Sequence, residues 1–164
     1  MMRMSTSFAG RWHGQRLDDE LAAVVLQPRL EAVIGAPLVR RAGALVLERL
    51  ATHAPGPQAF PDRAGYEAFV NKIHIDDFID AGGTAGDQLV TLIRQGAKAA
   101  VEFSRRLEAK GPFRVLLSLD PDTPTATLRF FGRREGQAWG AEDPDAFQLE
   151  EALMIDTPVT NTQR

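Results

Sequence analysis

The sequence predicts an α+β protein in which an N-terminal helical hairpin precedes a β-α-β-β-β unit. Three observations support this fold class. Residues 17–53 repeat apolar side chains at helical spacing, residues 87–111 form the strongest amphipathic helix, and three segments between 113 and 155 alternate apolar and polar residues. An antiparallel meander that packs its apolar face on the long helix accommodates these patterns.

The stretch over residues 17–35 predicts a first helix, which Pro28 interrupts, so we expect either a kink or two short helices. Gly35 ends this segment, because glycine is the preferred residue after a helix. A second helix is expected over residues 37–53, since Pro37 is well tolerated at the first helical position. Together the two helices form the predicted hairpin.

A proline- and glycine-rich stretch over residues 54–65 is the clearest boundary in the chain. We expect it to be a linker between the hairpin and an α+β domain over residues 66–157. The flanking residues 1–16 and 158–164 have the composition of a flexible N-terminus and a disordered tail. The alternative organisation is one integrated domain over residues 17–157.

The first strand of the α+β unit is predicted over residues 69–76, where apolar and polar residues alternate. A short helix over residues 62–70 is the competing interpretation of its first half. Thr84 or Asp87 can cap the long helix that follows. Gly96 and several alanines make one face of that helix thin, so we expect it to approach the sheet closely.

The sheet face opposite the long helix is expected to be mixed. Leu116, Phe131 and Met154 form an apolar island there, among charged residues such as Arg129 and Glu150. An apolar patch of this kind is normally covered, so we expect either the N-terminal hairpin or a partner to pack on it.

A non-enzymatic protein that binds another macromolecule is the leading functional expectation. Trp139 lies in a polar, glycine-flanked loop, where an aromatic residue either anchors a partner or folds back over the sheet edge. The partner is expected to be another protein, such as a toxin or enzyme that this chain neutralises, or a second copy of the chain. The candidate partner-binding residues are Trp139, Arg129, Phe131, Glu150, Leu116 and Met154.

A metal-dependent or acid/base enzyme is the first alternative. If residues 69–76 form a strand, His74 and Asp76 point to the same side, and Asp77 follows directly. This set is incomplete, because one histidine and one aspartate on the same face supply two ligands where a catalytic zinc needs three. Turns and caps at the end of a strand explain the same residues. A small-ligand module with a pocket between helix and sheet is the second alternative.

The composition narrows the functional classes further. No cysteine is present, which excludes disulfides, thiolate zinc sites and cysteine nucleophiles. The formal net charge is −3, whereas a duplex-binding domain usually carries a basic excess, so nucleic acid is a disfavoured partner. The glycine-rich loop at residues 82–86 lacks the lysine of a phosphate-binding loop, and no cofactor is expected.

The chain contains no apolar run of the length that a signal peptide or a membrane span requires. We therefore expect a cytoplasmic protein without membrane contact. Its abundance of alanine, arginine, glycine and proline is typical of a high-GC bacterial gene.

Overall fold

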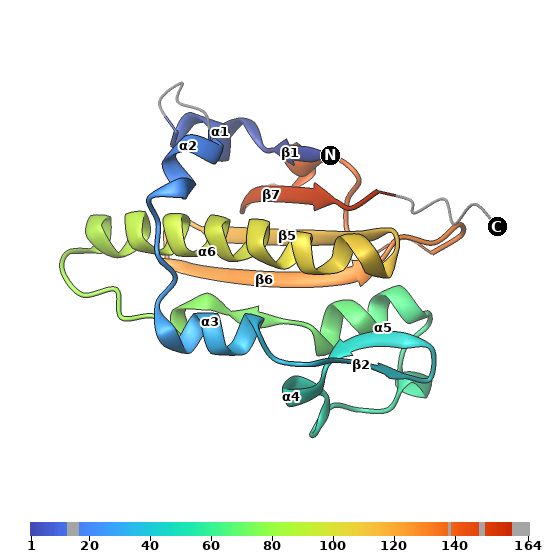
Figure 1. Ribbon diagram of the computed structural model, residues 1–164. Helices are drawn as coiled ribbons and strands as arrows, with labels where there is room; N and C mark the ends of the chain where they lie inside the picture. Colours follow the sequence, from blue (N-terminus) through green and yellow to red (C-terminus); the bar gives the residue numbers. More distant parts are fainter. Residues whose placement is uncertain (13–16, 138, 148–149, 159–164) are drawn as a thin grey trace.

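The computed structural model describes residues 1–12, 17–137, 139–147 and 150–158, and it confirms the α+β class (Figure 1). One long helix, α6 (Ala85–Leu107), packs across an antiparallel sheet. The strands of this sheet, in their order across it, are β1 (Met2–Met4), β7 (Glu151–Asp156), β5 (Phe113–Asp120), β6 (Thr125–Gly132) and β4 (Ile73–His74).

The predicted meander is wrong in one respect, because β7 pairs with β5 and not with β6. Leu117 of β5 faces Leu128 on one side and Leu153 on the other. The outer edge of β6 is already occupied, since Ile73 of β4 pairs with Leu128 there. The last strand therefore crosses over and pairs with the free edge of β5.

The thin face of α6 lies against the sheet, as expected. A Cβ atom added at Gly96 would lie 2.9 Å from Cδ1 of Leu117, so a larger residue would force the Leu117 side chain to move. Thr84 and Asp87 form a reciprocal capping box at the start of the helix. The side chains between α6 and the sheet form one continuous apolar core.

The predicted helical hairpin is wrong in its second half. The first half forms two short helices, α2 (Leu17–Ala22) and α3 (Pro28–Ile34), which confirms the interruption at Pro28. The second half forms strands β2 (Leu38–Arg41) and β3 (Ala44–Leu47), followed by the short helix α4 (Glu48–Ala51).

A two-residue turn explains why this segment is a β-hairpin. Ala42 and Gly43 both have positive φ, at 48° and 79°, and the pairing register runs directly across them from Arg41 to Ala44. Such a turn matches the twist of antiparallel strands, whereas two residues of positive φ interrupt a helix. Burial also favours the hairpin, because all four residues of β3 are buried in it.

The predicted strand over residues 69–76 is also wrong in its first half, where the competing helix is correct. Helix α5 (Arg63–Val70) begins at Asp62, whose side chain accepts a hydrogen bond from the Gly65 N–H. The strand that remains, β4, ends at His74 and a 3-10 turn, η2 (Ile75–Asp77), follows it.

Helix α5 connects the small hairpin with the main sheet through two buried side chains. Oε1 and Oε2 of Glu67 accept from the N–H groups of Leu45 in β3 and Gly132 in β6, at 2.9 and 2.7 Å. One turn later, Asn71 accepts from the Leu47 N–H and donates to the carbonyls of Leu45 and Phe130. These side chains occupy edge positions that another strand would otherwise fill.

Part of the N-terminal segment over residues 1–16, which the composition predicts to be flexible, forms regular structure, whereas residues 13–16 lie outside the described residues. Met2–Met4 pair with β7, and helix α1 (Thr6–Gly10) follows with Phe8 fully buried. Phe8 and Trp12 are buried in the core and Met4 packs against it, so these side chains anchor the segment. The tail predicted beyond Pro158 lies outside the described residues.

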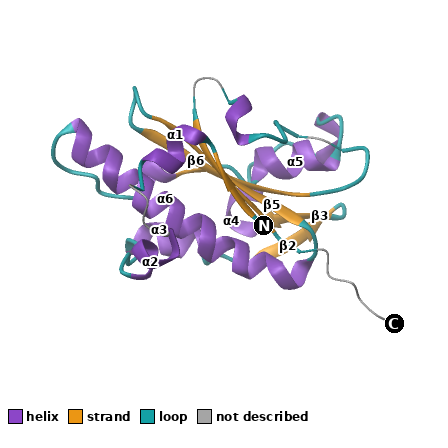
Figure 2. Cartoon of the chain, turned by 90° about the horizontal axis from the view of Figure 1, so that it is seen from above, coloured by secondary structure: helices purple, strands orange, loops and turns teal. Residues whose placement is uncertain are grey.

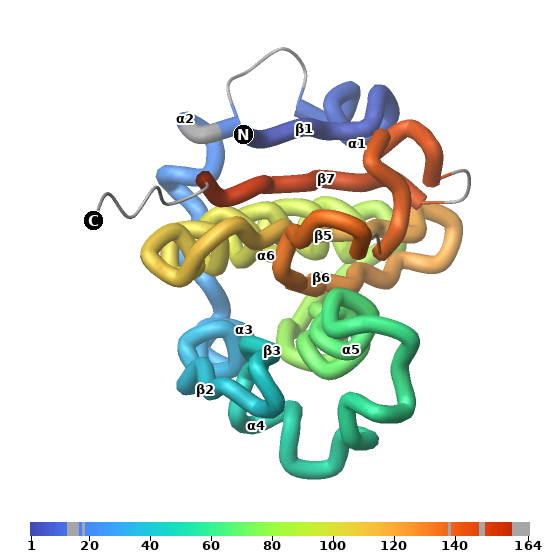
Figure 3. The backbone as a smooth tube through the Cα atoms, turned by 90° about the vertical axis from the view of Figure 1, so that its right-hand side faces the viewer, coloured from blue at the N-terminus to red at the C-terminus, as the bar shows by residue number. Residues whose placement is uncertain are grey.

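The main sheet separates two different layers. Figure 2 shows α6 on one side of the strands and α5 on the other. Figure 3 shows the stacked strands from their end, with the β2–β3 hairpin below β6 and beside α5. Within the part of the chain that the structure describes, no helix combines the length and apolar content that a membrane crossing requires.

Candidate binding surface around Trp139

The apolar island of the sequence exists, and the chain itself covers it. Leu116, Phe131 and Met154 are buried together on the sheet face opposite α6. The cover consists of α5, through Ala64 and Ala68, together with loop 139–147. Neither the N-terminal hairpin nor a partner is needed, which corrects the expectation. Because these three residues are buried, only exposed residues of this face can contact a partner directly.

Trp139 folds back over the island and remains partly exposed. Its ring meets the ring of Phe131 edge-on, with the centroids 5.2 Å apart. The guanidinium of Arg129 lies over the same tryptophan, 5.2 Å from the ring centroid. Burial lowers the pKa of Arg129, and the charge of Glu150 opposes this effect in part. The tryptophan is thus held between a buried ring and a cation.

An apolar hollow with a volume of about 240 Å³ lies beside Trp139, and we call it the aromatic groove. Phe69 at its rim is 50% exposed, which is unusual for a large apolar side chain, and its ring packs 5.1 Å from that of Phe60. The groove is lined by Phe60, Pro61, Gly65, Ala68, Phe69, Lys72, Arg129 and Trp139.

The charged side chains that line the aromatic groove are all positive. Among the described residues, Lys72 and Arg129 are the charged side chains that line it, and no carboxylate belongs to the lining. Neither cation forms an ion pair with another residue in the described ranges. The groove is therefore an apolar depression with a positive edge.

A second hollow, which we call the arginine pocket, has a volume of about 320 Å³ and shares Trp139 as a wall. Arg114 in it is almost fully buried, yet its guanidinium binds Asp156 at 2.7 Å. Arg134 is held by Glu67, at 2.8 Å. The pocket is lined by Pro112, Arg114, Phe131, Gly132, Arg133, Arg134, Glu135, Gln137, Trp139 and Glu142.

Glu150, the remaining residue of the predicted set, is exposed and lines a different hollow together with Asp120 and Phe147. Its charge reaches Arg129, but it does not line the aromatic groove. Of the six predicted residues, the structure thus brings Trp139 and Arg129 together at one surface site.

The alternative site at His74 loses its geometric basis. The strand ends at His74, so Asp76 lies in a 3-10 turn and not on the strand from which the same-face relation was predicted. Asp76 accepts the N–H of Ala126 at 3.1 Å, and the backbone carbonyl of Asp77 accepts from Arg29. Among the residues that are described, no group of three or more histidine and carboxylate side chains is placed to hold a metal ion.

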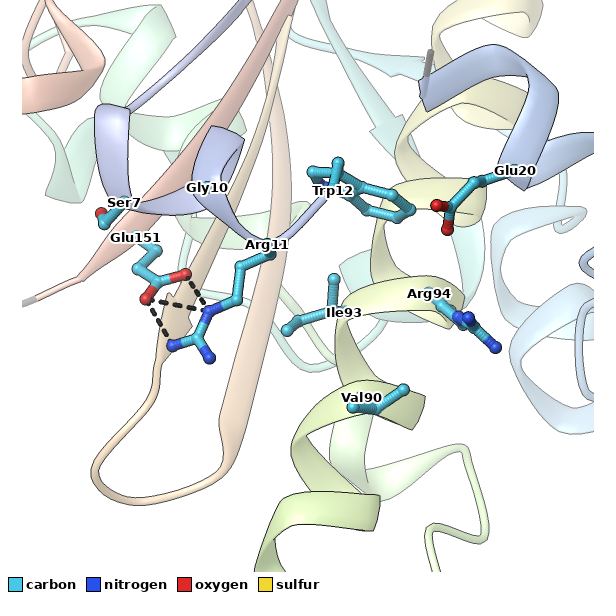
Figure 4. A pocket seen from close by; sticks show the side chains of 9 residues that line it. All are labelled: Ser7, Gly10, Arg11, Trp12, Glu20, Val90, Ile93, Arg94 and Glu151. Carbon is cyan, nitrogen blue, oxygen red and sulfur yellow. Dashed lines mark hydrogen bonds and ion pairs between the residues drawn. The ribbon is translucent and has the colours of Figure 1, made fainter. Parts of the chain in front are cut away.

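A further hollow lies between α1, α6 and β7, and we call it the N-terminal pocket (Figure 4). Its volume is about 510 Å³. Arg11 and Glu151 form a bidentate ion pair on one wall, with Nη2 2.6 Å from Oε1 and Nε 3.0 Å from Oε2. Glu20 and Arg94 lie on the other side, around Val90 and Ile93. No pattern in the sequence predicts this pocket, because its residues Ser7, Gly10 and Arg11 belong to a segment that the composition predicts to be flexible.

Several residues of the surface around Trp139 were also missed. Phe69 and Lys72 were assigned to a strand, so the groove they form with Phe60 could not be anticipated. The competing helix over residues 62–70 was the available signal, since it places Phe69 one turn after Gly65. Arg114 and Asp156 lie 42 positions apart, and no local pattern connects them.

Comparison with known proteins identifies a family and nothing beyond it. The model of the uncharacterized protein PM0498 family matches residues 14–164, and the chain belongs to this family. No curated protein and no solved structure matches the chain. All residues of the aromatic groove and the arginine pocket lie inside the matched range. The N-terminal pocket, by contrast, takes Ser7, Gly10, Arg11 and Trp12 from outside it.

Proposed function

We propose that this member of the uncharacterized protein PM0498 family binds another protein through the aromatic groove and catalyses no reaction. The observation that carries the proposal is the half-exposed Phe69 beside a preformed hollow that also holds Phe60 and Trp139. Aromatic residues and arginine are enriched among the residues that dominate binding energy at interfaces. A groove of about 240 Å³ accommodates one apolar side chain of a partner.

The charges of the groove favour an acidic partner. Lys72 and Arg129 have no ion-pair partner among the described side chains, and the pKa of Arg129 is lowered by burial. A carboxylate beside the anchoring side chain would relieve that cost, since complementary charges raise both specificity and association rate. The partner is therefore a protein segment that combines an apolar anchor with acidic residues. A bacterial, cytoplasmic setting is part of the proposal.

Site-specific photocrosslinking in the native host tests the proposal. A benzophenone amino acid is placed at Phe69 or, as the matched control, at Val25, an apolar residue that is 84% exposed on another surface. The expected result is a discrete adduct at position 69 that is absent at position 25. Its crosslinked peptide contains acidic residues. Identical adducts at both positions, or none at position 69, contradict the proposal.

Two further variants separate the proposal from its alternatives. Arg129→Glu is expected to abolish the adduct, because it reverses the charge at the groove, whereas His74→Ala leaves the adduct intact. The reverse pattern would favour the enzyme centred on His74 and Asp76. An adduct with twice the mass of the chain would identify the partner as a second copy of this chain and not as a different protein.

A further inference from the structure

The arginine pocket concentrates positive charge around a single buried carboxylate. Arg114 binds both oxygens of Asp156, through Nε at 2.7 Å and Nη2 at 3.1 Å. Arg3 also binds Asp156, at 3.0 Å, and Arg133 lies 3.7 Å from it. Three guanidinium groups thus surround the Asp156 carboxylate, and even with the carboxylate of Glu142, which also binds Arg114, an excess of one positive charge remains around a guanidinium that is 2% exposed.

Glu142 of loop 139–147 supplies a second carboxylate from outside. Its Oε2 accepts from Nη2 of Arg114 at 2.9 Å, but the Glu142 side chain is 76% exposed whereas that of Arg114 is 2% exposed. An exposed carboxylate regains its hydration when it leaves, so such a contact exchanges easily. Asp156, in contrast, is buried and stays in place. The two acidic partners of Arg114 therefore differ in how easily they can be exchanged: Glu142 is exposed, whereas Asp156 is buried.

From this asymmetry we infer that the arginine pocket is a carboxylate-binding site, which Glu142 fills in the free protein and an aspartate or glutamate of the partner fills in the complex. Glu142 itself shows that a carboxylate fits against Arg114. Arg133, with 42% of its side chain exposed, is available to the same ligand. Glu135, the other carboxylate of the lining, is exposed.

The position of the pocket connects it to the proposed function, on which the identity of the ligand rests. Trp139 is a wall of both the arginine pocket and the aromatic groove. A partner segment whose apolar side chain enters the groove therefore lies next to the arginine pocket, because Trp139 lines both. The recognised segment is one in which an acidic residue lies close in sequence to the apolar anchor.

Titration of the full chain with N-acetylglutamate amide tests the site directly, with N-acetylglutamine amide as the uncharged control. The arginine side-chain N–H signals are followed by NMR at constant ionic strength. Glu142→Gln is expected to bind the glutamate probe about tenfold more tightly than the unchanged chain, because the competing carboxylate is gone. Arg133→Gln is expected to weaken it. The glutamine probe should bind none of the variants.

Asp122→Asn is the matched control, since it removes the same charge from an exposed turn at the other end of β5. If it strengthens binding as much as Glu142→Gln does, general electrostatics and not the pocket cause the effect, and the inference fails. Phe69→Ser should leave probe binding unchanged, because Phe69 does not line the pocket. Failure of crosslinking at position 69 together with normal probe binding therefore rejects the proposed function while retaining the carboxylate site.

Discussion

The two faces of the main sheet are built from neighbouring residues and held by different forces. On the face toward α6, Leu117 and Phe130 belong to a continuous apolar core. On the opposite face, Leu116 and Phe131 belong to a small cluster under α5 and loop 139–147. Buried ion pairs surround this second cluster, among them that of Arg114. Apolar packing predominates on the first face, whereas ion pairs accompany the apolar cluster on the second.

The largest effect is expected on the apolar face. Phe130→Ala removes a ring that packs 4.8 Å from the ring of Phe103, and it should lower the free energy of unfolding by about 4 kcal/mol, as deletion of a buried aromatic ring typically does. Urea denaturation measures the change. Phe131→Ala on the other face should cost less, because part of its packing is against the half-buried Trp139. Equal losses would remove the contrast between the faces.

The second largest effect is expected at the buried ion pair between Arg114 and Asp156. Asp156→Ala leaves the guanidinium of Arg114 buried without its main partner, and it should cost roughly 3 kcal/mol of unfolding free energy. Replacing both residues, in Arg114→Met/Asp156→Leu, should cost less than the single change, since no uncompensated charge remains. A double variant as unstable as the sum of its single variants would instead show that Arg114 and Asp156 are not energetically coupled, and this account of the ion pair would fail.

The third effect concerns the contact between α5 and the two sheets. Asn71→Ala leaves buried backbone groups of Leu45, Leu47 and Phe130 without a partner, so we expect a loss of about 2 kcal/mol. Hydrogen exchange should show faster opening of the β2–β3 hairpin than of β5. Uniformly faster exchange through the whole chain would indicate that the hairpin and sheet unfold as one unit.

Acid should affect the polar face first. Burial raises the pKa of Asp156, but the hydrogen bond from Arg114 and the charges of Arg114, Arg133 and Arg3 outweigh it, so the pKa lies below its ordinary value. A carboxyl group of this kind adds stability above its unfolded pKa and loses it as the pH falls through the folded pKa. Urea denaturation at a series of pH values should show this decline, and Asp156→Asn should flatten it. If the pH profile of Asp156→Asn equals that of the unchanged chain, other carboxyl groups cause the decline.

The smallest effect on stability is expected at the aromatic groove. Phe69 is half exposed, so Phe69→Ser should change the free energy of unfolding by no more than about 0.5 kcal/mol. Crosslinking from a neighbouring groove position should nevertheless decrease strongly. A large loss of stability would show instead that Phe69 belongs to the fold and not to a binding surface.

The sequence by itself determined the elements whose signals are local. Thr84, Asp87 and the apolar spacing specify α6 within its own residues, and alternation specifies β5 and β6. Alternation also identified Leu116, Phe131 and Met154 as one cluster. The same alternation places Arg129 on that face, whereas Trp139 is conspicuous as an aromatic residue in a polar, glycine-flanked loop.

Only the tertiary structure decided which residues meet across the chain. The segment from Leu38 to Leu47 has helical spacing, but Ala42 and Gly43 turn it into a hairpin that Glu67 and Asn71 then hold. The arginine pocket and the aromatic groove likewise combine residues from distant segments. Local patterns encode dihedral preferences and the burial of one face, whereas these sites depend on contacts whose free energy is gained only after the sheet has formed.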